Sequence, residues 1–333
     1  MTYLHTGIFG KTLVEDLQGK GFSRSEIVGN TGIDISLLNG EEPKVPFDSL
    51  ALLFERAAEL TGDDLLGFRH AQNSDYRRLG LIAFTGVSSP DVRSLLHTLS
   101  RYQRINSDVL LMDSSQLDNE GILQWHYQVP RRVVRQQFVE FNATGLVHVL
   151  RRLTGRELVP LDLGFRHFRG SNLQPLVQYF GRTPELGSAE NRLQFRLEDL
   201  DLPLQTSDHL LNRMLTKFSE DALAQLAESK PSLANSVEEI IARSPTKTQA
   251  EVARDLGMSA RSLSRRLAEA DTSFFKVVEG YREAVAKNML RESDFQLTEI
   301  AFVLGYSDLS TFSTAFRRWA GSTPTEYRKQ FRR

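Results

Sequence analysis

The sequence predicts an α+β N-terminal domain, with helices around a small sheet, followed by an all-α C-terminal domain. Strand-like alternation of apolar and polar residues occurs between residues 109 and 197. A helical sequence repeat occurs twice between residues 249 and 320. The length of 333 residues suits two domains, at ~100–200 residues each. We therefore expect domains at 1–205 and 233–333, with a helical connector at 206–232.

Helical periodicity recurs along the N-terminal domain. In the segment 47–60, Phe47, Leu50, Phe54 and Ala57 share one face of a helix. Pro90 suits the first turn of another helix, because its missing N–H has no partner there. The segments expected to be helical are 8–17, 47–60, 89–104, 132–153 and 172–180.

The strand pattern begins at residue 109. Residues 109–112 and 122–129 are strand-like runs on either side of the polar residues 118–121, which predicts a hairpin. In the second run, Leu123, Trp125 and Tyr127 share one face of the strand. Further strands are expected at 158–168 and 192–197.

Residues 208–228 form one more predicted helix, which resembles neither neighbouring domain in charge or pattern. Pro231 ends it, since proline cannot continue a helix. Two interpretations are equally compatible with this pattern, a connector that helps to form a homodimer and a helix that packs on its own domain.

Composition excludes several classes of function. The chain has no cysteine, which excludes disulfides, zinc fingers, iron–sulfur clusters and thiol catalysis. No histidine pair has the spacing of a metal site, so we expect neither a metal nor a cofactor. The apolar stretches fall short of the ~20 residues of a membrane helix, and no secretory signal is readable at the N-terminus. We expect a cytoplasmic protein without a membrane partner.

The formal net charge of −1 conceals two unequal parts. Residues 233–333 hold 16 lysines and arginines against 13 acidic residues, a net of +3, whereas the other residues hold 25 against 29, a net of −4. Basic charge at one end is a modest indication of a polyanionic partner.

The repeat in the basic part is the strongest signal. Residues 251–259 and 299–307 share Glu, Ala, Leu, Gly and Ser at matching positions. The small Ala253 allows two helices to cross closely, and Gly257 suits a left-handed turn. Ser259 and Ser307 can cap the helix that follows each turn. These features predict helix-turn-helix motifs at about 249–270 and 297–320.

Two matched copies favour nucleic-acid binding over a helical hairpin without such a role. Helix-turn-helix motifs place their second helix in the major groove of double-stranded DNA, where arginine pairs with guanine. On the outer faces of the two second helices we expect base contacts from Arg261, Ser264 and Arg265 and from Ser310, Ser313 and Thr314, followed by phosphate contacts from Arg317 and Arg318. Solvated surface positions are the alternative for Arg261, Arg265, Ser310 and Ser313.

A long helix at 274–291 separates the two motifs. Its ~18 residues span about 27 Å at 1.5 Å per residue. This length is of the order of one DNA turn, ~34 Å. One chain could therefore place two reading helices in successive major-groove segments.

The C-terminal motifs resemble the DNA-binding domain of the AraC/XylS family of bacterial transcriptional regulators. The resemblance covers 233–333 and is carried by residues 300–301, 304–306, 312–313 and 316–328. The last of these contains the family ending Phe-Arg-Arg-x-x-Gly-x-Thr-Pro-x-x-Tyr-Arg. The resemblance implies base reading by the two groups of residues named above. Family members often carry a basic or amide side chain at the position of Thr314.

The first 205 residues resemble the arabinose-binding-type N-terminal domain of one branch of that family. Residues 32–38, 57–63, 79–81, 165–167 and 187–193 carry this resemblance. It implies a pocket for a small-molecule effector, which need not be a sugar. Aromatic walls with a few polar groups suit a partly apolar ligand, and the candidates are Trp125, Tyr127, His148 and His167. The alternative for these four residues is a role in the core.

The sequence thus predicts a homodimeric transcriptional regulator without catalytic residues, in which an effector alters promoter occupancy or recruitment of RNA polymerase. Two other classes remain open. The first is an architectural DNA-binding protein that responds to no effector. The second is an enzyme fused to a DNA-binding module, although no nucleophile elbow, phosphate-binding loop or zinc-protease motif is present. Activation and repression are both compatible with this prediction.

Overall fold

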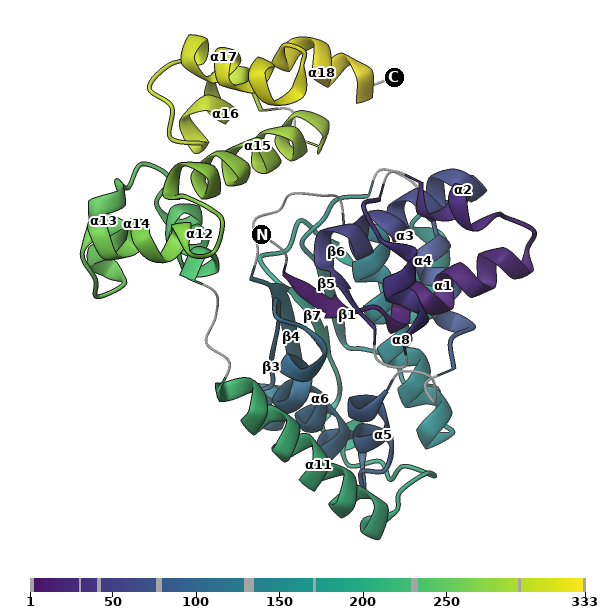
Figure 1. Cartoon of the computed structure of the whole chain (residues 1–333). Helices are drawn as coiled ribbons and strands as arrows, with labels where there is room; N and C mark the ends of the chain where they lie inside the picture. Colours follow the sequence, from purple (N-terminus) through teal and green to yellow (C-terminus); the bar gives the residue numbers. More distant parts are fainter. Residues whose placement is uncertain are drawn as a thin grey trace. The chain divides into compact units, whose positions relative to one another are not determined.

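The computed structural model describes residues 3–29, 31–40, 43–75, 80–128, 135–169, 172–228, 233–292 and 295–331. The described chain forms two compact units, one up to residue 228 and one from residue 233 (Figure 1). None of the described helices is long and apolar enough to cross a membrane.

The first unit begins with a two-stranded antiparallel sheet and a group of helices. Strand β1 (Leu4–Thr6) pairs with β2 (Lys44–Pro46), and His5 lies opposite Val45. The helices of this part are α1 (Ile8–Gly19), α2 (Arg24–Val28), η1 (Ile35–Asn39), α3 (Phe47–Thr61) and α4 (Leu66–Gln72). The predicted helices 8–17 and 47–60 are therefore present. The first is two residues longer than expected, and the second is one residue longer.

A five-stranded sheet is the centre of the first unit. Its strand order is β3-β4-β7-β5-β6, and only the β5–β6 pair is parallel. Leu123, Leu163 and Leu193 are fully buried on neighbouring strands, and Trp125 lies opposite Met112 and Asn191. The strands are β3 (Leu110–Asp113), β4 (Ile122–Tyr127), β5 (Asp162–Phe165), β6 (Glu185–Leu186) and β7 (Asn191–Gln194).

The predicted alternation on the second strand is present, because Leu123, Trp125 and Tyr127 are all buried. The hairpin prediction needs one correction. Strands β3 and β4 do pair antiparallel, but the polar stretch between them contains a short helix, α7 (Leu117–Glu120), that ends at Gly121 with φ +73°. The expected strand 158–168 is shorter, since only four of its residues are in β5.

Further helices pack on this sheet and on one another. Helix α8 (Gln136–Thr154) corresponds to the predicted helix 132–153, whose first three residues lie outside the described chain. Helix α11 (His209–Glu228) is the predicted helix 208–228, and it lies beside α5 and α6 (Figure 1). The remaining helices are α5 (Leu81–Val87), α6 (Val92–Asn106), α9 (Gln174–Phe180) and α10 (Leu197–Leu200).

The second unit is entirely helical where it is described. It consists of α12 (Leu233–Arg243), α13 (Gln249–Asp255), α14 (Ala260–Ala268), α15 (Phe274–Glu292), α16 (Leu297–Val303), α17 (Leu309–Ala320) and α18 (Pro324–Phe331).

Helix α15 belongs to two separate hydrophobic cores. Val278 and Tyr281 in its first half pack with α12, α13 and α14. Ala286 and Leu290 in its second half pack with α16 and α17. Val285 contacts both cores. The prediction of an all-α domain, in which one long helix joins two helical pairs, is confirmed.

Candidate functional site

The first helical pair has the local geometry that the sequence predicts. Thr248 and Glu251 form a reciprocal capping box at the start of α13. Gly257 adopts φ +66°, a left-handed conformation that favours glycine. Ser259 then accepts a hydrogen bond from the backbone N–H of Ser262 and caps α14. These contacts fix where the second helix begins, and therefore which side chains it exposes.

In the second pair, the cap differs from the prediction. Gly305 adopts φ +77°, as its match to Gly257 suggests. However, Asp308 rather than Ser307 caps α17, by accepting a 2.7 Å hydrogen bond from the N–H of Thr311. The one-residue insertion in this copy of the repeat moves the helix start by one position. The hydrogen bonds from Thr311 and Ser307 lower the pKa of the Asp308 carboxyl.

Helix α14 exposes the polar face that was predicted to read bases. Arg261, Ser264 and Arg265 are exposed, whereas Leu263 and Leu267 are fully buried in the core. The Ser264 hydroxyl contacts the side-chain amide of Gln249 on α13. Arg265 lies 3.7 Å from Glu269 in an exposed i,i+4 pair. Such surface pairs contribute at most ~1 kcal/mol, so the Arg265 guanidinium can exchange this partner for another.

Helix α17 exposes a face of short hydroxyl side chains. Ser310, Thr314 and Arg317 are exposed and Ser313 is half-buried, while Phe312 and Phe316 are fully buried. The Thr314 hydroxyl donates to the carbonyl of Ser310 at 3.0 Å. The exposed face therefore combines short hydroxyl side chains with Arg317, and Ser310 and Thr314 also line a hollow with Arg318.

Arg318 is oriented differently from Arg317. Its guanidinium bonds to the Glu279 carboxylate on α15, which also accepts a 3.0 Å hydrogen bond from the indole N–H of Trp319. This contact directs one nitrogen of Arg318 towards α15, while the side chain is 61% exposed and keeps further donors for another partner.

The first unit contains a cavity of about 180 Å³. Helices α5, α6 and α8 and strands β3 and β4 contribute to its wall, together with His5 and Phe9 from the start of the chain. Trp125 and Tyr127 line this cavity. His148 and His167 do not line it, so the structure brings together two of the four candidate effector residues. Burial and the nearby Arg152 and Arg151 lower the pKa of His148.

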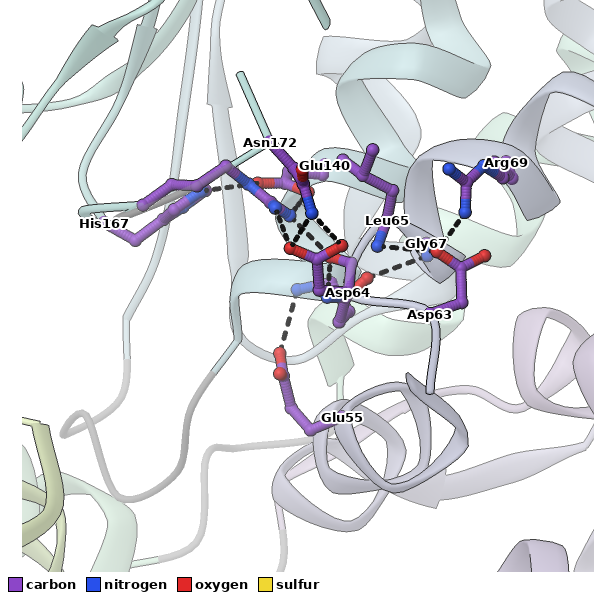
Figure 2. A network of polar contacts seen from close by, with 11 residues as sticks. Glu55, Asp63, Asp64, Leu65, Gly67, Arg69, Glu140, His167 and Asn172 are labelled. Atoms are coloured by element: carbon purple, nitrogen blue, oxygen red, sulfur yellow. Dashed lines mark hydrogen bonds and ion pairs between the residues drawn. The ribbon is translucent and has the colours of Figure 1, made fainter. Parts of the chain in front are cut away.

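His167 belongs instead to a polar network whose centre, at Glu140 and Arg169, is buried (Figure 2). Its Nε2 lies 3.1 Å from Glu140 Oε1, and because a carboxylate only accepts, this nitrogen carries the proton. Arg169 donates to both oxygens of Glu140, at 2.9 and 2.7 Å, and to the backbone carbonyl of Asp64. Asn172 donates to the Asp64 carboxylate at 2.8 Å. The network ties α8 to the segments before α4 and after β5.

Several polar side chains line the cavity together with Trp125 and Tyr127, namely those of His5, Ser74, Gln103, Asn106 and Asn142. The Nδ1 of His5 lies 3.0 Å from the Thr6 carbonyl. Burial is the main reason why the pKa of His5 is lowered to about 4, and the charge of Lys44 adds to this shift. The indole Nε1 of Trp125 and Oε1 of Gln103 are buried without a hydrogen-bond partner. Sequence patterns did not single out His5 or Gln103 as cavity residues.

Helix α11 contacts the two helices that form one side of the cavity. The hydroxyl groups of Thr85 on α5 and Ser219 on α11 are 3.1 Å apart. On α6, Tyr102 donates a 2.6 Å hydrogen bond to Glu220, which also pairs with Arg101 at 2.8 Å. Thr85 and Tyr102 directly precede Gly86 and Gln103, which line the cavity. Hence, on both α5 and α6, a residue that contacts α11 is directly followed by a residue that lines the cavity.

Among the described residues, no group of three or more His, Asp or Glu side chains is arranged to hold a metal ion.

Comparison with known proteins gives matches to both units. Residues 21–204 match the family described as the arabinose-binding domain of AraC transcription regulator, N-terminal. Residues 252–330 match a helix-turn-helix domain family. Each match lies within one of the two compact units.

Several relatives align over nearly the whole chain. An uncharacterized HTH-type transcriptional regulator of Mycobacterium tuberculosis is 26% identical over 337 residues, covering 96% of this chain and 95% of the relative. The ornithine utilization regulator of Pseudomonas aeruginosa is 24% identical over 324 residues, with the same coverages of 96% and 95%. The crystal structure of the transcriptional regulator CdpR from Pseudomonas aeruginosa covers 97% of this chain and 98% of that chain, at 19% identity and a TM-score of 0.46.

Proposed function

Because this chain belongs to the AraC family of transcriptional regulators, with an arabinose-binding-type N-terminal domain and a helix-turn-helix DNA-binding domain, we propose that a small-molecule effector in the first domain controls promoter binding by the second. The observation that carries this proposal is the position of α5 and α6, whose adjacent residues contact the cavity and α11.

In the proposed mechanism, α14 and α17 enter successive major-groove segments of double-stranded DNA. Arg261 and Arg265 supply base contacts from α14, because exposed guanidinium groups near the start of a recognition helix can pair with guanine. Ser264, Ser310, Ser313 and Thr314 supply shorter contacts, and Arg317 neutralises a phosphate. Arg318 supplies a second phosphate contact with the donors that its bond to Glu279 leaves available.

The effector site in this proposal is the cavity lined by Trp125 and Tyr127. His167 has a structural role here, since its Nε2 is bound to Glu140. An effector that displaces α5 or α6 changes the contacts of Ser219 and Glu220 on α11. The chain continues from α11 to α12, so a change in α11 alters the DNA-binding units or their spacing in a dimer. Promoter occupancy or recruitment of RNA polymerase then changes.

We further propose that α11 forms the homodimer with a second copy of itself. Its outward face exposes Leu210, Met214 and Phe218, each by more than half, which is unusual for apolar side chains this large. Arg213 lies in the first half of the helix and Asp221 in the second, and both are exposed. An antiparallel, two-fold symmetric pairing therefore places unlike charges beside the apolar contact.

The experiment that tests the regulator proposal starts from DNA selection. The purified chain selects its preferred site from random duplexes, and fluorescence anisotropy then compares affinity for this site with affinity for random DNA. A sequence-specific regulator favours its site by ~10³-fold or more at physiological salt. An architectural protein gives nearly equal affinities, which would contradict the proposal.

The effector part is tested separately with the same protein. Native mass spectrometry of the purified chain, followed by release under denaturing conditions, detects a bound small molecule and measures the number of copies per assembly. We expect a dimer and a compound that changes occupancy of the selected site. A site-specific dimer whose occupancy responds to no bound compound or candidate metabolite would indicate a constitutive binder.

A further inference from the structure

The wall of the cavity in the first unit is mainly apolar and contains no charged side chain among its described residues. Leu95, Leu99 and Met112 line one part, and Phe141, Leu146 and Val149 line another. A sugar or a charged amino acid would lose hydrogen bonds to water on entering such a site without finding equivalent partners. The wall therefore suits an uncharged molecule with a mainly apolar surface.

The polar groups in the wall determine which hydrogen bonds the polar end of that molecule has to make. Trp125 Nε1 is a donor and Gln103 Oε1 is an acceptor, and both are buried without a partner. The residues are only 5% and 8% exposed, so bulk water does not satisfy these atoms. Rotation of the Gln103 amide can turn its polar atoms towards a bound molecule.

His5 adds a second acceptor. It donates from Nδ1 to the carbonyl of Thr6, and its ring is neutral at pH 7 because its pKa is lowered to about 4. In this tautomer, Nε2 carries a lone pair and accepts hydrogen bonds. Ser74, Asn106 and Asn142 also line the cavity, so its wall holds both donors and acceptors. Such a wall favours a ligand group that can both donate and accept, such as a hydroxyl.

Cavity size limits the body of the ligand. A dry apolar cavity of ~150 Å³ binds benzene. The volume of about 180 Å³ therefore accommodates a single ring with one or two substituents.

We propose that the effector is a compact, uncharged hydroxylated molecule of the size of a substituted phenol, bound with its ring among the apolar residues and its hydroxyl against Trp125 and Gln103. This assignment rests on the proposed function, because it identifies the ligand class of the same cavity.

Four probes of similar size separate the features of this proposal. Isothermal titration calorimetry with the full chain at pH 7 compares p-cresol, toluene, 4-methylbenzoate and L-arabinose. p-Cresol and toluene differ by one hydroxyl, and 4-methylbenzoate replaces this hydroxyl by a charged carboxylate. We expect p-cresol to bind about tenfold more tightly than toluene, because its hydroxyl adds two neutral hydrogen bonds, to Trp125 and Gln103, that each contribute about threefold. We expect no binding of 4-methylbenzoate or arabinose.

Two variants locate the binding. Trp125→Phe keeps an aromatic ring but removes the N–H, and it should reduce the preference for p-cresol over toluene to about threefold or less. Gly145→Leu should abolish binding of both, because Gly145 lines the cavity and a Cβ there has no neighbour closer than 3.9 Å. Leucine is also a better helix former than glycine, so this variant is expected to fold. Its folding is checked by its thermal unfolding midpoint.

The outcomes distinguish the ligand class from the regulator function. Equal binding of toluene and p-cresol would overturn the role of the hydroxyl, and cavity binding of 4-methylbenzoate or arabinose would overturn the uncharged, apolar class. If p-cresol binds in the cavity without changing DNA occupancy, the ligand chemistry is supported and the effector role fails. If no probe binds but another metabolite changes occupancy, the class is wrong and the regulator function stands.

Discussion

The guanidinium carbon of Arg282 lies 4.8 Å from the ring centroid of Tyr306, in a cation–π contact between α15 and the turn of the second helix-turn-helix motif. The same guanidinium donates a 2.9 Å hydrogen bond to the carbonyl of Pro245, which precedes the first motif. A Cβ on Gly305 would lie 2.8 Å from that carbonyl oxygen, so the two segments approach closely. Arg282 thus provides a second link between the two motifs, in addition to the helix α15 that they share.

Arg282→Leu should weaken binding to a site that spans both motifs by about tenfold. The substitution removes a cation–π contact and a hydrogen bond from a charged donor, which together stabilise the relative placement of the motifs by roughly 1–3 kcal/mol. Anisotropy on full sites and on half-sites measures the effect. Half-site affinity should change much less.

Lys287→Leu is the matched control, because it also removes one positive charge from α15. Lys287 pairs with Glu283 on its own helix and contacts neither motif in the described hydrogen bonds. If Lys287→Leu and Arg282→Leu reduced full-site affinity equally, the effect would be one of charge and not of placement.

Arg265→Ala should cost about 1–3 kcal/mol at the selected site and relax the preference at one base pair. The reason is that Arg265 is exposed on the face of α14 opposite the buried Leu263 and Leu267. Selection from a randomised site with the variant identifies the base pair. Equal losses on specific and random DNA would instead make Arg265 a phosphate contact.

Arg317→Ala is the comparison for a phosphate contact. We expect it to weaken binding to specific and random DNA by similar factors, and to reduce the slope of log affinity against log salt by about 1. A base-specific loss at Arg317 would contradict the roles that we assign to α17.

Met214→Glu should convert the proposed dimer into a monomer. Met214 is 52% exposed on the apolar face of α11, and an interface through this face would bury the new carboxylate of each copy without a partner. Light scattering after size-exclusion chromatography measures the mass. Gln225→Glu, at an exposed position on the same helix, adds the same charge beyond the exposed apolar residues and should leave the dimer largely intact.

The DNA-binding unit could be predicted in detail because its information is local. The glycine, capping and core positions of each motif lie within about twenty residues of one another, and both copies of the repeat contain them. The single error in this pattern concerned the cap of α17, where Asp308 replaces Ser307 after an inserted residue. Helix α12 was not predicted as a separate element, although Val237 and Ile241 have helical spacing and are fully buried.

The effector cavity was only partly predictable, because its wall combines distant segments. The alternation in β4 correctly placed Trp125 and Tyr127 on an inward face. Nothing local distinguishes Gln103 from the other polar residues of α6, or His5 from His167. Their surroundings differ because β1 brings His5 to the cavity, whereas β5 leads His167 to Glu140. The tertiary fold alone determines that difference.

His5 should make the first unit less stable in acid. Its folded-state pKa, about 4, lies below the ordinary value of 6.5, so the unfolded chain binds the proton more tightly. Stability from the neutral ring is therefore fully present above pH 6.5 and is lost as the pH falls from 6.5 to about 4. Over this window the loss is about 3 kcal/mol, at 1.36 kcal/mol for each unit of pKa difference. His5→Asn, which keeps a donor near Nδ1, should remove this contribution to the pH dependence.

Urea unfolding at pH 7 and pH 4.5 measures the effect. The chain has two tryptophans, so Trp319→Phe leaves Trp125 as a fluorescent reporter of the first unit. In this background, the free energy of unfolding should fall with pH by about 2–3 kcal/mol more with His5 than with His5→Asn. His209→Gln, at an exposed histidine, should retain the full pH dependence. If the free energy of unfolding fell equally between pH 7 and pH 4.5 with His5 and with His5→Asn, His5 would have the same pKa in the folded and unfolded states, which would contradict the prediction.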